Sequence, residues 1–207
     1  MGERKGVTLI ELLIAIALLG VISAIGLLIL NPATFMAKRR DAQRVSDLLV
    51  MQVAIDAYVA KYNVAPGADK VMFFSNCGRF KLSTGPPAPP NCNIGDAQKA
   101  DGSGWIDGTV IDGTVKPLSE FISTLRVDPI NKGILVIDLD QLYLYYRNGS
   151  KYFISAYMET NKYLAQNDGS TIDKGTAQGA NFAERYDVGN SVNLVSELIV
   201  DIGPLSW

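Results

Sequence analysis

The sequence predicts an α+β protein in which one long amino-terminal α-helix packs against a small head built on an antiparallel β-sheet. Three observations support this prediction. Residues 7–30 form an apolar run in which only Glu11 is charged, and residues 33–63 continue with helical periodicity. Further along, runs of aromatic and β-branched residues flank Asn148-Gly149, a dipeptide typical of tight hairpin turns.

The apolar run is long enough to cross a membrane. Its 24 residues, at about 1.5 Å each, exceed a bilayer core of roughly 30 Å. A secretory signal peptide has a shorter apolar core, so the run does not fit that class. An ordinary signal anchor fits its length, and a buried core helix of a soluble enzyme fits least. The core helix fits least because polar residues are nearly absent for six turns. A signal anchor does not explain Glu11, because a carboxylate in a membrane helix costs roughly 2.5–3.5 kcal/mol at mid-bilayer, and less near an end, and therefore needs a partner or a purpose.

A second helical stretch follows directly. Asn31-Pro32 closes or kinks the first helix, because proline lacks an amide donor and clashes with the preceding turn. The helix then continues to about Asn63, with one buried stripe at spacings of three and four: Val45, Leu48, Gln52, Ile55, Val59 and Tyr62. Other apolar residues widen this surface: Val50, Val53, Ala54, Ala57 and Tyr58. We therefore expect two partners, the head on one side and neighbouring molecules on the other.

Two cysteines, Cys77 and Cys92, flank a proline-rich stretch that cannot form a regular element. We interpret them as one disulfide, which would stabilise a loop of this length by about 3 kcal/mol in the chain-entropy model. The alternatives are two free thiols or a metal site, and the metal site is weaker because the chain has no histidine. A disulfide would place the head outside the reducing cytosol.

Charge is distributed unevenly. Residues 33–62 hold five basic and three acidic side chains, whereas residues 63–207 hold twelve basic and sixteen acidic ones. An acidic head is a poor general ligand for nucleic acid. The basic residues just past the apolar run would favour a cytoplasmic position under the positive-inside rule: Lys38, Arg39, Arg40 and Arg44. We give the expected disulfide more weight, since large domains can translocate despite such charges.

Residues 68–116 are predicted to be a long connection that contains two copies of Ile-Asp-Gly-Thr-Val. A calcium loop built from Asp101, Asp107 and Asp112 is one hypothesis, but the five-residue interval does not match the ligand spacing of an EF-hand. Turn formation by Asp-Gly is the preferred interpretation. Residues 167–173 are a second weak calcium candidate. We therefore expect no metal and no cofactor.

The later sequence predicts a short helix over residues 117–125, with Pro117 in its first turn. Strands are expected over residues 134–137, 142–147 and 152–158. We assign the tyrosines of these strands to sheet packing rather than to a sugar-binding surface. After Asn161 the pattern weakens, and residues 192–202 fit either a strand or a helix.

The amino-terminal sequence resembles the cleavage and methylation signal of type IV prepilins and type II secretion pseudopilins. A short basic leader ends at Gly6, and Thr8-Leu9-Ile10-Glu11-Leu12-Leu13 matches the family motif. The resemblance implies cleavage after Gly6 and methylation of the new amino-terminal Val7, where the family usually has Phe. It also implies that Glu11 pairs with the amine of a neighbouring subunit. Residues 40–48, Gly104-Trp105-Ile106 and Val127-Asp128-Pro129 also resemble positions in such pilins.

The resemblance implies a leader at residues 1–6, a transmembrane and assembly helix at 7–30, a helix continuation at 31–63 that packs on the head, and a head at 64–207. The expected function is a structural pilin that forms a type IV pilus-like surface filament. The alternatives are a pseudopilin of a type II secretion system and a single-span tethered module that never polymerises. We expect no enzyme activity, because histidine and recognisable catalytic motifs are absent from the sequence.

The partners implied are further copies of this chain, a prepilin peptidase, the membrane before assembly and the assembly machinery. The expected location is the cytoplasmic membrane for the precursor, with its head outside the cytosol, followed by a cell-surface filament.

Overall fold

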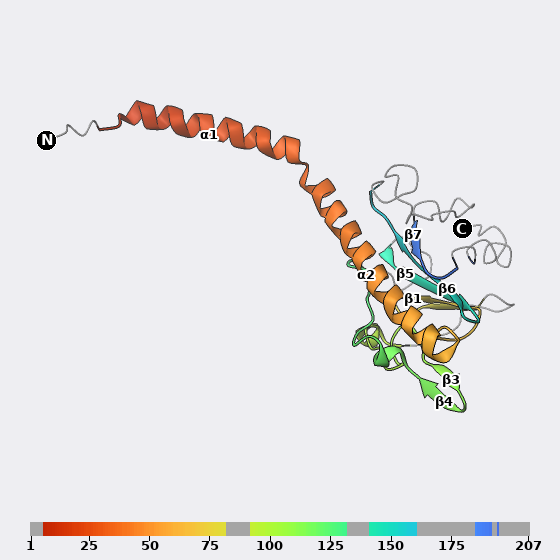
Figure 1. The fold of residues 1–207 in the computed structure, drawn as a ribbon. Coiled ribbons are helices and arrows are strands. Elements are labelled where there is room, and N and C mark those ends of the chain that lie inside the picture. Colours follow the sequence, from red (N-terminus) through yellow and green to blue (C-terminus); the bar gives the residue numbers. More distant parts are fainter. Residues whose placement is uncertain (1–5, 82–91, 132–140, 161–184, 192–193, 195–207) are drawn as a thin grey trace.

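The computed structural model describes residues 6–81, 92–131, 141–160, 185–191 and 194, without the side chains of residues 24–30, 80, 81 and 94. Two consecutive helices form a rod, and the head packs around the carboxyl-terminal one (Figure 1). The architecture confirms the predicted α+β class, with a long helix packed on a small antiparallel sheet.

Helix α1 spans Leu9–Leu30, and its described side chains are all exposed. Its amino-terminus is capped by Thr8, whose hydroxyl accepts a hydrogen bond from the backbone N–H of Glu11 at 3.3 Å. Among helices whose side chains are described, none meets the length and apolarity needed to cross a membrane. The predicted transmembrane segment includes residues 24–30, whose side chains lie outside the described part.

The rod bends between the two helices, at the position predicted from Asn31-Pro32 (Figure 1). Asn31 has φ 28° and ψ 83°, which is not helical, and Pro32 occupies the first turn of α2 (Pro32–Tyr62). The Asn31 side chain accepts a hydrogen bond from the N–H of Thr34 at 3.4 Å and so caps α2. Asn63, in the left-handed conformation, ends this helix.

The buried face of α2 differs from the predicted stripe. Leu48 and Ile55 are buried as predicted, but the other four stripe residues are only half-buried. The observed face includes charged side chains, and its members are Asp41, Arg44, Asp47, Leu48, Met51, Ala54, Ile55 and Tyr58. Three of the four half-buried stripe residues, Val45, Val59 and Tyr62, still pack against the core, so the stripe lies along one edge of the buried face. The rest of the face was missed because an apolar pattern cannot detect the part that is occupied by charges.

The main sheet has five antiparallel strands in the order β2-β1-β5-β6-β7. Its members are β1 (Val71–Phe74), β2 (Arg79–Lys81), β5 (Tyr143–Asn148), β6 (Lys151–Tyr157) and β7 (Arg185–Val188). The β5–β6 hairpin confirms the prediction, with one change in register. Asn148 pairs with Lys151, so the turn residues are Gly149, at φ 63°, and Ser150.

Several predictions for the head were wrong. The region expected to be a connection contains β1 and β2, which are only four and three residues long, and β1 is buried throughout, without the alternation that marks a strand. The helix expected over residues 117–125 is reduced to the single 3₁₀ turn η2 (Leu118–Glu120), and another such turn is η1 (Ile94–Asp96). The strand expected at 134–137 and the segment 195–202 lie outside the described residues.

The repeated Ile-Asp-Gly-Thr-Val forms a small second sheet, made of β3 (Thr109–Ile111) and β4 (Thr114–Lys116). Asp112 and Gly113 at its turn both have positive φ, as a type I′ turn requires. This confirms the turn interpretation for Asp112.

Tyrosines of the main sheet bind it to α2, as the packing interpretation predicted. The hydroxyl of Tyr143 donates to Asp47 at 3.0 Å, and that of Tyr152 donates to Asp56 at 2.6 Å. The Tyr145 hydroxyl donates at 2.7 Å to a backbone carbonyl just after α2. Each ring therefore fills the space between sheet and helix, while its hydroxyl finds a partner at the edge.

Candidate processing site and assembly surface

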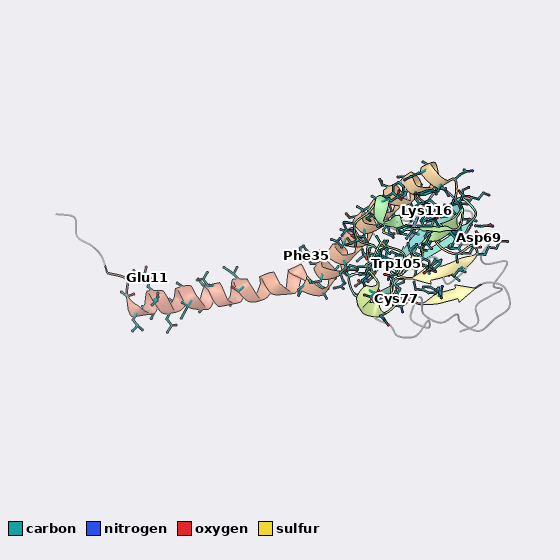
Figure 2. The ribbon with its side chains drawn as sticks, turned by 90° about the horizontal axis from the view of Figure 1, so that it is seen from below. Glu11, Phe35, Asp69, Cys77, Trp105 and Lys116 are labelled. Carbon is teal, nitrogen blue, oxygen red and sulfur yellow. A yellow bond between two sulfur atoms is a disulfide. The ribbon has the colours of Figure 1, made fainter. Side chains whose placement is uncertain are left out.

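The predicted cleavage junction lies at the free end of the rod. Gly6 and Val7 precede α1, have no regular structure and are exposed. Figure 2 shows Glu11 near this end, far from the head residues Trp105 and Lys116. A peptidase could therefore reach the Gly6–Val7 bond without contact with the head. The structure does not test cleavage, methylation or the role of Glu11, which remain predictions.

Glu11 occupies the first turn of α1, where the helix dipole favours a negative charge. Thr8 and Glu11 have the spacing of a capping box, and the Thr8 half of this motif is present at 3.3 Å. Cleavage would add an α-ammonium at Val7, four residues before Glu11 and on the same helix face. The carboxylate can thus stabilise its own helix or bind an amine, its own or that of another copy.

The surface of α1 is apolar on every side. Large side chains are exposed around the helix, from Leu9 at 82% to Ile14 at 53%. Burial of such a side chain contributes roughly 1.5–3 kcal/mol. An isolated copy in water would therefore leave a large favourable free energy unrealised, and this surface is suited to lipid or to other apolar helices.

Helix α2 carries a second exposed apolar surface, which is bordered by a segment of the head. Val53 is 70% exposed there, next to Leu49 and Val50. Together with Ala54 they line an open groove of about 350 Å³, whose other wall is Phe121 and Ile122. We call this the outer groove. The sequence predicted an apolar surface here, and its predicted occupation by neighbours is not tested.

A buried ion cluster fixes the head on α2, and the sequence analysis missed it. Arg44 Nε donates to Asp128 at 2.6 Å, and Arg44 Nη1 donates to Asp41 at 3.0 Å and to Glu159 at 2.7 Å. Burial alone would lower the pKa of Arg44, but bonds to the carboxylates outweigh it and raise that pKa. The hydrogen bond from Arg40 is the main cause of a lowered pKa at Glu159.

The cluster joins three distant parts of the chain. Asp41 also accepts hydrogen bonds from the backbone N–H groups of Glu159 and Thr160, at 2.9 and 2.8 Å. The loop at Asp128 and the end of β6 are thereby held against the first part of α2. The pair Asp41 and Arg44, three residues apart on one helix face, was the available sequence signal, but nothing near it in sequence indicated the partners.

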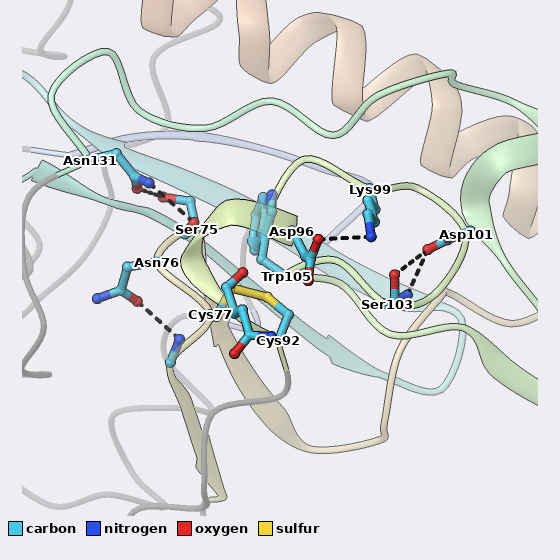
Figure 3. Close-up of a disulfide and its surroundings, with 12 residues drawn as sticks. Ser75, Asn76, Cys77, Cys92, Asp96, Lys99, Asp101, Ser103, Trp105 and Asn131 are labelled. Atoms are coloured by element: carbon cyan, nitrogen blue, oxygen red, sulfur yellow. Dashed lines mark hydrogen bonds and ion pairs between the residues drawn. A yellow bond between two sulfur atoms is a disulfide. The ribbon is translucent and has the colours of Figure 1, made fainter.

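The predicted disulfide between Cys77 and Cys92 is present, with the two Cα atoms 5.2 Å apart (Figure 3). It lies beside Trp105, a fully buried residue whose indole N–H donates to the carbonyl of Arg126 at 2.9 Å. A Cβ at Gly104 would lie 1.9 Å from the carbonyl oxygen of Lys99, which explains the glycine before this tryptophan.

The acidic residues of the hypothetical calcium loop form hydrogen bonds and an ion pair within the head. Asp101 accepts hydrogen bonds from the N–H and hydroxyl of Ser103, and Asp107 forms an ion pair with Arg79 at 3.1 Å. Within the described ranges, no group of three or more His, Cys, Asp or Glu side chains is arranged to hold a metal ion. The second candidate, residues 167–173, lies outside those ranges.

Comparison with known proteins gives one match. Residues 1–27 match the family model described as the prokaryotic N-terminal methylation motif. Searches of curated proteins and of solved structures gave no match. The motif covers the cleavage junction, Glu11 and most of α1. It fits a membrane-anchored precursor and implies processing by a prepilin peptidase in a pilus assembly context.

Proposed function

Because residues 1–27 carry the prepilin-like signal of type IV pilins and pseudopilins, we propose that this chain is a pilin-like structural subunit. A prepilin peptidase cuts it between Gly6 and Val7 and methylates the new amine. The precursor is held in the cytoplasmic membrane by residues 7–30, with its head outside the cytosol. The mature chain then polymerises into a type IV pilus-like surface filament.

The observation that carries this proposal is the bare surface of α1. Its described apolar side chains lack any cover from the head, and Figure 2 shows the helix projecting away from it. Lipid would cover this surface in the precursor. In a polymer, the same surface would be covered by α1 helices of other copies, and the burial would drive assembly.

Glu11 then sets the position of one subunit relative to the next. Inside a bundle of apolar helices an unpaired carboxylate is costly, and so is an unpaired ammonium. Both costs fall when Glu11 of one copy meets the Val7 amine of another. Since each chain supplies one acid and one amine, the same pairing repeats along a filament.

We also propose that the mature chain catalyses no reaction. It has no histidine, and both cysteines are in the disulfide. The carboxylates of the buried cluster are bound to arginines and to backbone N–H groups, which suits structural support rather than proton transfer.

Mass spectrometry of the amino-terminus, on protein isolated from cells, tests the processing step. We expect a chain that begins with N-methylated Val7. A chain that still begins at Met1 would instead support the non-polymerising tethered module. Electron microscopy of the same cells should show surface filaments that contain this protein, whereas a secretion pseudopilin would give none of normal length at the surface.

The first prediction concerns the charge of Glu11. Glu11→Gln keeps the size and capping ability of the side chain but removes its charge, and Glu11→Val removes both. We expect both variants to insert into the membrane and to yield at least about tenfold less filament, since tenfold corresponds to only about 1.4 kcal/mol per subunit. Immunoblots of sheared filaments and of membranes measure the two pools.

The matched control is Glu120→Gln, which makes the same change at an exposed ion pair of the head. It should leave the filament yield unchanged. Normal filaments from Glu11→Gln would show that charge pairing at this position does not direct assembly. A loss in Glu11→Val alone would indicate that Glu11 acts as a helix cap.

A further inference from the structure

We infer that the outer groove of α2 binds α1 of a second copy, at Gly20. This inference rests on the proposed function and adds to it which surfaces meet. The groove is lined by Leu49, Val50, Val53 and Ala54 on the helix, and by Phe121 and Ile122 on the opposite wall. It carries no charged side chain, so its occupant should be an uncharged and apolar segment.

The groove belongs to a longer uncharged face of α2. Seven exposed residues share this side of the helix at spacings of three, four and seven: Ala42, Ser46, Leu49, Val50, Val53, Ala57 and Ala60. Solvent-facing positions of a helix normally carry charged or polar side chains. An uncharged face of this length, opposite the face that packs on the sheet, indicates a second helix as partner.

Lipid is a poor candidate for that partner. Leu49 lies nineteen residues beyond the end of α1 at Leu30, which corresponds to about 28 Å along a helix. If α1 occupies the membrane, the groove lies well outside it. The partner is then a protein segment, and α1 has an exposed and uncharged surface that begins directly after Glu11.

Gly20 identifies the part of α1 that fits. A glycine inside a helix costs about 1 kcal/mol relative to alanine, so it needs a reason. In this chain a Cβ added at Gly20 would meet nothing within 4 Å, and the fold of the single copy therefore does not require glycine. Glycine does allow another helix to approach closely. Val53 is 70% exposed, more than Leu49 or Val50, and its side chain can occupy the space left by the missing side chain of Gly20.

The contact defines a displacement between the two copies. Gly20 and Val53 are 33 residues apart, so the second copy is shifted by about 50 Å along the rod. Such a head-to-tail contact does not close on itself and generates a filament rather than a dimer.

Cysteine cross-linking in assembled filaments tests the contact. Val53→Cys with Ser23→Cys places one thiol in the groove and one a single turn from Gly20, and Ser→Cys changes little in volume. We expect oxidation to give severalfold more covalent dimer than Ala42→Cys with Ser23→Cys. Ala42 is also exposed on this face, but it lies about 21 Å along the helix from the level of Ser23 in this contact. Filaments with equal or no cross-linking in the two pairs would overturn the groove contact and leave the proposed function intact.

A size exchange provides an independent test. Gly20→Val raises helix propensity, so α1 itself is not weakened, but the added side chain should block the approach and lower filament yield at least about tenfold. Val53→Ala in the same chain should restore most of that yield. Normal filaments from Gly20→Val, or no recovery in the double variant, would contradict the contact. Absence of filaments from the unmodified chain would instead contradict the proposed function.

Discussion

The two halves of the rod have similar backbones and opposite surroundings. Helix α1 has no described side chain that is buried, whereas α2 buries eight residues, three of them charged. Short helices gain most of their stability from tertiary packing. The stability of α2 therefore comes from the chain itself, while that of α1 depends on a medium or partner outside it. This difference separates folding, which involves the head and α2, from the proposed assembly, which would involve α1 and the outer groove of α2.

The largest expected effect comes from alkaline pH, which should act on α2 and not on α1. Burial raises the pKa of Tyr143, Tyr145 and Tyr152, all in the layer between sheet and helix. The unfolded chain titrates its tyrosines near pH 10. Their contribution is complete below that pH and is lost as the pH rises toward the folded pKa values, by about 1.4 kcal/mol per pH unit for each tyrosine and about 4 kcal/mol for three.

Denaturant unfolding of the detergent-solubilised chain from pH 8 to 11, followed by tryptophan fluorescence, to which the buried Trp105 contributes, measures this loss. Helix α1 contains no tyrosine, so its helicity in the micelle should persist after the head has unfolded. The part of the tyrosinate absorbance that comes from these three residues should rise only as the head unfolds. If these tyrosines ionised near pH 10 without loss of stability, the hydroxyls would not be enclosed between sheet and helix.

The next prediction concerns the buried ion cluster around Arg44. Arg44→Met removes one partner and leaves Asp128 and Asp41 buried without their cation, which should lower the free energy of unfolding by about 3–5 kcal/mol. Arg39→Met makes the same change at an exposed position of the same helix and should stay within about 0.5 kcal/mol. Equal stabilities of the two variants would show that the cluster does not hold the head on α2.

The same division explains what the sequence could and could not predict. The helix break at Asn31-Pro32 and the β5–β6 hairpin depend on local rules, so neighbouring residues were sufficient to place them. The disulfide was predicted because the chain has only two cysteines. The cluster around Arg44 joins residues more than 80 positions apart, and no local pattern encodes such a pairing. Strand β1 was missed because its four residues are all apolar and show no alternation, and β7 because it has only four residues and two of them are charged.

The candidate site also shows that local sequence patterns do not reveal contacts between distant segments. The motif around Glu11 was recognisable because its chemistry is contained in one short segment. The outer groove was only partly predictable. Its helix wall follows from the second apolar face of α2, but the opposite wall, Phe121 and Ile122, comes from a segment about seventy residues away that was expected to be helical. A helical pattern identifies an unpartnered face but not the loop that shapes it.

The smallest expected effects separate folding from assembly within a single turn of α2. Leu48 is fully buried and Leu49 is 39% exposed, so Leu48→Ala and Leu49→Ala make the same change at a buried and at an exposed position of one helix. Leu48→Ala should lower the free energy of unfolding by about 2–5 kcal/mol, and Leu49→Ala by no more than about 0.5 kcal/mol. If Leu49 belongs to the groove contact, Leu49→Ala should be as stable as the unmodified chain and still yield less filament. A loss of stability equal to that of Leu48→Ala would mean that the exposed side of α2 also stabilises the fold of the single copy.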